Sequence, residues 1–167
     1  DRDVLRRVPH IATLALLVVL STASAGIVDY LFKKGVADVA GSRAELQRIF
    51  ALFYMGVGLL TFVAQTGATE VIRRFGLGRA MASLPAGLGL TAAVALVIPK
   101  ILPIVVARAT EAVFRGSWFR SGYELLFVPM ASGTRHRAKG ILDVICDRVG
   151  EAAGSGIVQL LLFAGVA

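Results

Sequence analysis

The chain has 167 residues, of which 56% are hydrophobic and only 17% are charged, and its mean hydropathy is +0.75. Soluble domains carry about 25% charged residues, so this composition excludes an ordinary soluble domain and indicates a membrane protein. The formal net charge is +7. The basic residues nevertheless form no surface run with interleaved aromatic residues, and nucleic-acid-binding motifs are absent, which argues against DNA or RNA as a partner.

Five apolar segments follow one another along the chain, and each is long enough to be a transmembrane helix. A helix needs about 20 apolar residues to cross the hydrocarbon core of a bilayer. The segments are 11–32, 49–69, 80–99, 101–130 and 140–167. The first three hold at most one charged residue each, whereas the last two hold several. We therefore predict an all-α fold, a polytopic membrane helix bundle with five transmembrane helices in a single domain over residues 1–167.

Basic residues in the connecting segments predict the orientation. Nine of them fall on the side of the N-terminus and five on the opposite side. Because basic loops stay in the cytoplasm, the N-terminus is predicted to be cytoplasmic. Transporter folds are often built of six-helix halves. Five helices thus predict a fragment of a longer twelve-helix transporter, five of the six helices of one major-facilitator-like half, with a free-standing five-helix protein as the alternative.

Charged residues inside the apolar segments are the candidate functional residues. Each ionised side chain at the centre of a membrane helix costs about 2.5 to 3.5 kcal/mol, so these groups are expected to face protein or water. Arg108, Glu111 and Arg115 follow at steps of three and four residues, and Asp29 and Lys33 are four apart. Residues at this spacing share one helical face, so opposite charges can pair along it. A purely structural role, in which the pairs only join helices, is the alternative.

Cationic groups in a water-filled route attract anions, and arginine donates in a planar fork that suits phosphate. An anionic, phosphorylated solute is therefore the predicted substrate, although a proton-coupled carrier of another solute also fits the spacing. The predicted substrate-binding residues are Arg108, Arg115, Lys139 and Lys33. The predicted charge-balancing or proton-coupling residues are Asp29, Glu111, Glu124, Asp143 and Asp147.

The basic loop RRFGLGR, with Arg73, Arg74 and Arg79, has the character of the loop that controls gating in a facilitator half. Simple anchoring at the cytoplasmic surface is the alternative. Enzyme chemistry is not expected, because phosphate loops, nucleophile motifs and metal-ligand spacings are absent and the single Cys146 has no nearby base. We expect no metal and no cofactor. The expected partners are the lipid bilayer, the substrate anion and the missing N-terminal half of the same chain.

Two stretches, YELLFVPM and RHRAKGILDVICDRVGEAAGSGIVQLLL, resemble the ATP/ADP antiporter family, the nucleotide transporters of intracellular bacteria and plastids. The positions that match the family pattern are Glu124, Pro129, Lys139, Asp143, Val144, Arg148, Gly150 and Gln159. Upstream, GIVDYLFKK resembles the acidic-x-x-x-Lys signature at the start of the family's second half, with Asp29 and Lys33 in the matching places. VIRRFG resembles the loop between its next two helices.

The resemblance covers about residues 11–165 and implies the second half of a transporter related to the major facilitator fold, which exchanges ATP for ADP or imports nucleotides with protons. It also implies that Asp29 and Lys139 are important for transport. The chain departs from the family in having Asp29 instead of the usual Glu, and Glu151 where the antiporters tend to have Lys. The DYLFK form is similar to orphan relatives in free-living bacteria, which implies a bacterial inner membrane. A non-transporting anchor or sensor for an attached cytosolic domain is the alternative function.

Overall fold

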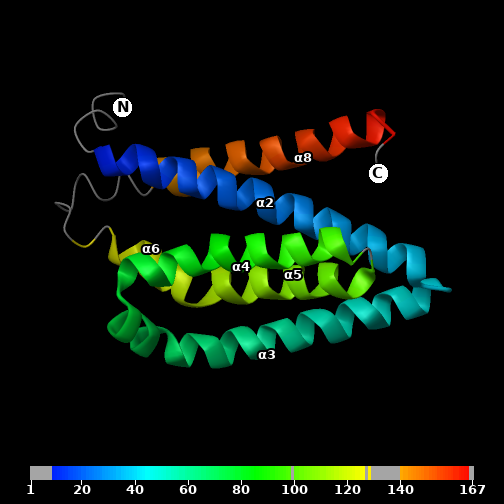
Figure 1. Cartoon of the computed structure of the whole chain (residues 1–167), viewed down its shortest axis with the longest axis horizontal. Coiled ribbons are helices and arrows are strands. Elements are labelled where there is room, and N and C mark those ends of the chain that lie inside the picture. The colour runs from blue at the N-terminus through cyan, green and yellow to red at the C-terminus, as the bar shows by residue number, and fades with distance from the viewer. Residues whose placement is uncertain (1–8, 99, 127, 129–139, 166–167) are drawn as a thin grey trace. The chain divides into compact units, whose positions relative to one another are not determined.

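A computed structural model describes residues 9–98, 100–126, 128 and 140–165. Every regular element in this part of the chain is a helix, so the all-α part of the predicted fold class is confirmed for these residues (Figure 1). The elements are α2 (Pro9–Val39), α3 (Arg43–Phe75), α4 (Leu77–Val97), α5 (Ile101–Phe114), η1 (Arg115–Phe119), α6 (Arg120–Leu125), η2 (Ile141–Cys146) and α8 (Asp147–Phe163). The labels η1 and η2 denote short π-helical segments that continue into α6 and α8.

Within the described residues, each of the five predicted spans overlaps a helix or consecutive helical segments. By length and composition, two helices among the described residues could cross a membrane, Ala15–Val39 within α2 and Arg43–Phe75. The fourth predicted span contains α5, η1 and α6, and the fifth contains η2 and α8; residues 127, 129–130 and 166–167 of these spans lie outside the described residues. The bundle of five transmembrane helices stays a prediction.

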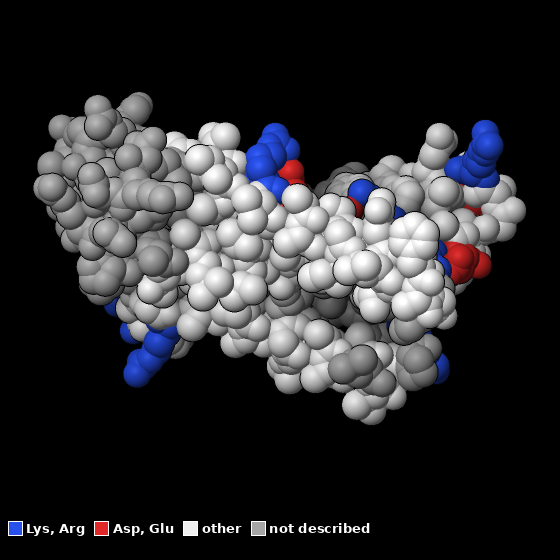
Figure 2. All heavy atoms as spheres, turned by 90° about the horizontal axis from the view of Figure 1, so that it is seen from above, with Lys and Arg blue, Asp and Glu red and all other residues white. Residues whose placement is uncertain are grey.

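The surface of these helices suits apolar surroundings. Only 6% of the most apolar part of α3 is buried within the protein, and its exposed side chains include Leu52, Met55, Leu59 and Phe62. Uncharged residues predominate on the face shown in Figure 2, where Lys, Arg, Asp and Glu lie in a few separate groups. Exposed apolar area of this extent marks a membrane or partner contact, which indicates a membrane protein.

Polar residues define both ends of α3. The Ser42 hydroxyl accepts a hydrogen bond from the backbone N–H of Glu45 at 3.2 Å, and the Glu45 carboxylate accepts one from the N–H of Gly41 at 3.0 Å. These bonds satisfy N–H groups that have no partner within the helix, as in a capping box. At the other end Gly76 has φ of 80°, a conformation that glycine adopts without steric cost, and its N–H donates to the Ile72 carbonyl at 2.9 Å. Helix α3 therefore ends there and α4 begins at Leu77.

The chain forms two compact units, a central unit of Val28–Leu126 and a terminal unit of Asp1–Ile27 with Phe127–Ala167. In the central unit α4 packs on α5, and α3 packs on both α5 and η1. Phe32, in the second half of α2, is fully buried, and its ring centroid lies 4.2 Å from that of Phe53 on α3. Leu84 of α4 is also buried. This apolar core fixes the helices that carry the charged residues.

The helix that follows Ile101 is broken inside η1, where Ser117 has φ of −108° and ψ of −115°. Side chains from two other helices bind the broken segment. The Gln65 amide of α3 donates to the Gly116 carbonyl at 2.7 Å, and the indole N–H of Trp118 donates to the Ser83 hydroxyl of α4 at 2.7 Å. The Gln65 bond satisfies a backbone carbonyl beside the break, and the Trp118 bond ties the broken segment to α4, so the break is part of the fold.

Replacing Gly116 by alanine should lower the free energy of unfolding by about 1 to 3 kcal/mol, the usual cost of overpacking. A Cβ at this position would lie 2.7 Å from the Cγ2 methyl of Thr61, and the β-branched threonine cannot easily turn away. Thr61→Ser removes that methyl, so the double variant should regain most of the loss. Denaturant unfolding of the purified full-length protein measures both effects. Simple additivity of the two changes would contradict the contact.

In the terminal unit α8 packs closely on the first half of α2 through two glycines. A Cβ at Gly150 would lie 2.8 Å from the Val19 carbonyl oxygen, and one at Gly154 would lie 2.7 Å from the Ala23 carbonyl oxygen. Both glycines are buried. The sequence Gly150-x-x-x-Gly154 therefore brings two helix backbones together, as small residues at this spacing do in membrane proteins.

Candidate functional site

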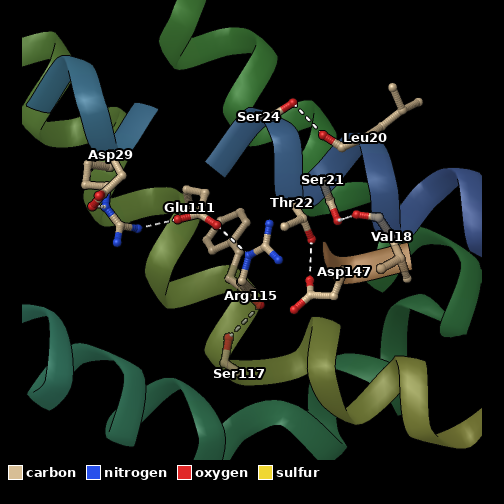
Figure 3. A network of polar contacts seen from close by, with 12 residues as sticks. Val18, Leu20, Ser21, Thr22, Ser24, Asp29, Glu111, Arg115, Ser117 and Asp147 are labelled. Carbon is tan, nitrogen blue, oxygen red and sulfur yellow. Dashed lines mark hydrogen bonds and ion pairs between the residues drawn. The ribbon is translucent and has the colours of Figure 1, made fainter. Parts of the chain in front are cut away.

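Five of the predicted site residues form one network of ion pairs in the central unit. Asp29 of α2 accepts from Lys33 Nζ at 2.6 Å and from Arg108 Nε of α5 at 3.0 Å. Arg108 also contacts the Glu111 carboxylate through Nη1, and Glu111 Oε1 accepts from Arg115 Nε at 2.5 Å. The order is Lys33, Asp29, Arg108, Glu111 and Arg115, with cations and anions alternating. Figure 3 labels Asp29, Glu111 and Arg115 of this network. The network is thus continuous from α2 through α5 into η1.

Burial differs strongly along this network. The side chain of Glu111 is 1% exposed, that of Arg108 is 17% exposed and that of Asp29 is 24% exposed, whereas Lys33 is 55% exposed. Glu111 is stable as a buried carboxylate because each of its oxygens accepts from a guanidinium. In these contacts three cations alternate with two carboxylates. Guanidinium and ammonium groups in such a setting can also donate to the oxygens of a bound anion.

Local spacing positions most of the network, and tertiary structure adds one bond. The pairs Asp29–Lys33 and Glu111–Arg115 are four residues apart, and Arg108–Glu111 are three apart, so one helical face supplies both partners, as predicted. The bond between Asp29 and Arg108 instead joins two helices. This bond makes one network out of two local pairs.

Asp147 lies in the terminal unit at the start of α8, and its carboxylate accepts a hydrogen bond from the Thr22 hydroxyl of α2 at 2.7 Å (Figure 3). The bond is one helical turn from Gly150, which contacts the same part of α2. Asp147 therefore binds α2 beside one of the two glycine contacts between α2 and α8. The predicted role of Asp147 in balancing charge or coupling to protons stays a prediction.

Three other predicted site residues are Glu124, Asp143 and Lys139. Glu124 is exposed on α6. The backbone of Asp143 lies in η2, and its side chain lies outside the described part of the structure. Lys139 also lies outside the described residues. Among the residues that the structure describes, no group of three or more His, Cys, Asp or Glu side chains is arranged to hold a metal ion.

The three arginines of the predicted gating loop are exposed where α3 turns into α4. Arg73 Nη2 lies 2.7 Å from Glu70 Oε2, and Arg74 Nε contacts the other oxygen of the same carboxylate. Arg79 lies in the first turn of α4. Glu70 was absent from the predicted site, although its spacing of three and four residues before the arginines is visible in the sequence. The gating role of this loop stays a prediction.

Sequence reasoning missed three further contacts of these helices. No sequence pattern predicts that Thr22 binds Asp147, because the two residues are 125 positions apart. The break at Ser117 and the bond from Gln65 to the Gly116 carbonyl carry none either, since they depend on how α3 packs against η1. All three arise from helix packing.

The fold and the network together define a helical chain that exposes many large apolar side chains and carries an ion network with a buried centre at Glu111. Comparison with known proteins is consistent with a membrane carrier. The chain is 25% identical over 174 residues to "ADP,ATP carrier protein 2, chloroplastic" of Arabidopsis thaliana. The aligned region covers 92% of this chain and 28% of that protein. It is 24% identical over 173 residues to the "Plastidic ATP/ADP-transporter" of Solanum tuberosum, with 92% of this chain and 27% of that protein covered.

The weak similarity extends over most of the chain and suggests an ATP/ADP transporter family, in agreement with the resemblance predicted from the residues. The chain spans 28% of the length of the Arabidopsis carrier. No family model matches the chain. No solved structure matches it either.

Proposed function

We propose that this chain is part of a secondary carrier that exchanges or imports ATP, ADP or a related phosphorylated anion by alternating access. The observation that carries the proposal is the network of Lys33, Asp29, Arg108, Glu111 and Arg115, in which phosphate-binding types of side chain are clustered in a largely apolar helical unit. The similarity to proteins named as ATP/ADP carriers supports the same conclusion.

In this proposal the chain supplies five helices of the second six-helix half of a major-facilitator-like transporter, and the N-terminal half completes the carrier. The N-terminus lies in the cytoplasm and the membrane is the bacterial inner membrane. Arg108, Arg115, Lys33 and Lys139 bind the phosphates, because guanidinium and ammonium groups donate to phosphate oxygens. Asp29, Glu111, Glu124, Asp143 and Asp147 balance these charges or couple transport to protons. Arg73, Arg74 and Arg79 form the gating loop.

Uptake of labelled ATP and ADP by proteoliposomes of the full-length protein tests the proposal. Lys139→Ala and Arg115→Gln should each reduce uptake about tenfold, because each removes a charge-assisted bond to phosphate. Arg48→Gln serves as the matched control, since Arg48 is exposed on α3 outside the network and its loss should leave uptake unchanged. Absence of uptake by the wild-type protein, or equal uptake by wild type and Arg115→Gln, would exclude nucleotide carriage by this network.

One observation favours the alternative of a non-transporting anchor or sensor for an attached cytosolic domain. Both carboxylates of the network are already bound by two cations each within the chain, as expected of a purely structural cluster. In that case Arg115→Gln lowers the free energy of unfolding, and the wild-type protein takes up no nucleotide. Measuring unfolding and uptake on the same preparations separates the two functions.

A further inference from the structure

The two carboxylates of the network have different surroundings. Glu111 is 1% exposed and is bound by two arginines of its own helical segment. Asp29 is 24% exposed, and it lies between Arg108 and Lys33, the most exposed cation of the network. A buried carboxylate between two guanidiniums cannot leave without stranding charge, whereas a partly exposed one can turn toward water. Asp29 is therefore the exchangeable carboxylate.

The two cations that Asp29 binds are Lys33, the most exposed cation of the network at 55%, and Arg108, the least exposed at 17%. Arg108 directs Nε to Asp29 and Nη1 to Glu111. A guanidinium has five N–H donors. Two nitrogens of Arg108 bind described residues, which leaves further N–H groups that can bind another oxygen ligand. Lys33 offers a second cation on the other side of the same carboxylate. The Asp29 carboxylate consequently occupies the place between two cations where a phosphate group would make its strongest contacts.

We propose that Asp29 is a resident anion of the empty site, and that a substrate phosphate binds by displacing it from Lys33 and Arg108. This inference rests on the proposed function of the network. Displacement breaks two ion pairs, so the entering group has to satisfy both cations. A terminal phosphate carries about −1.5 to −2 charges at pH 7 and has three acceptor oxygens, which meets that requirement. Chloride, with one charge, does not. Asp29 thereby restricts the site to multivalent phosphates.

The test measures dissociation constants of ADP and of inorganic pyrophosphate for the purified full-length protein. Asp29→Asn should bind both ligands about fivefold more tightly, the size of contribution that partly exposed ion pairs make. In the same variant, replacing gluconate by chloride at constant ionic strength should weaken pyrophosphate binding, because chloride no longer competes with a carboxylate. Asp29→Glu restores a carboxylate and should behave as the wild type.

Asp38→Asn is the matched control, because Asp38 is an exposed carboxylate on the same helix and its removal changes the net charge equally. Its effect on the dissociation constants should be much smaller. Asp29→Ala provides a second variant if Asp29→Asn does not fold. Unchanged or weaker pyrophosphate binding by a folded Asp29 variant, or an equal gain in Asp38→Asn, overturns the inference. Tighter pyrophosphate binding without any ADP binding supports the inference while it removes nucleotides from the proposed function.

Discussion

Replacing Glu111 by alanine should lower the free energy of unfolding by about 3 to 5 kcal/mol. The Glu111 side chain is 1% exposed, and its two oxygens accept from Arg108 and Arg115. Removing one partner of a buried ion cluster leaves the remaining charges without compensation in a medium of low dielectric constant, which costs far more than the loss of a surface pair. Denaturant unfolding of the purified full-length protein in detergent measures the change.

The chain contains its own control for this prediction. Glu70 also binds two arginines of its own helical segment, Arg73 and Arg74, at spacings of three and four residues, but its side chain is 41% exposed. Glu70→Ala should therefore have a much smaller effect than Glu111→Ala, because water and salt screen exposed ion pairs. Equal losses in the two variants would show that the burial of Glu111 has no energetic consequence.

Replacing Gly154 by alanine should lower the free energy of unfolding by about 1 to 3 kcal/mol. The added Cβ would lie 2.7 Å from the Ala23 carbonyl oxygen and 3.1 Å from the Ala23 Cα. These are backbone atoms, so no side-chain rotation relieves the clash and α8 has to move away from α2. The same change should also lengthen the hydrogen bond between Thr22 and Asp147, which joins the two helices nearby. Unfolding of the full-length protein in detergent measures the loss.

Gly156 is the matched control, two residues further along α8. A Cβ at this position meets no heavy atom within 4 Å. Gly156→Ala should therefore raise the free energy of unfolding by about 0.5 to 1 kcal/mol, because alanine loses less conformational entropy than glycine in a helix. The two alanine variants are thus expected to change the free energy of unfolding in opposite directions. A loss of stability in both would argue against close packing as the cause of the Gly154 effect.

Local sequence determined the helices and the local ion pairs. The apolar segments placed the helical regions, although α2 extends to Val39 and α3 covers Arg43–Phe75, beyond the predicted spans. Spacings of three and four residues predicted the pairing of Asp29 with Lys33 and of Glu111 with its two arginines, because these side chains share a helical face whatever surrounds the helix. Gly150 and Gly154 also have the four-residue spacing at which small residues let membrane helices approach closely.

Only the tertiary structure decided which helices these faces meet. The bond from Asp29 to Arg108 joins residues 79 positions apart, and that from Thr22 to Asp147 joins residues 125 positions apart. The deep burial of Glu111 and the break at Ser117 also follow from packing. A helix that is apolar on nearly every side carries no stripe that fixes its rotation about its own axis. The sequence of such a helix shows which charges can pair along it, and packing against its neighbours decides which charges join into one network.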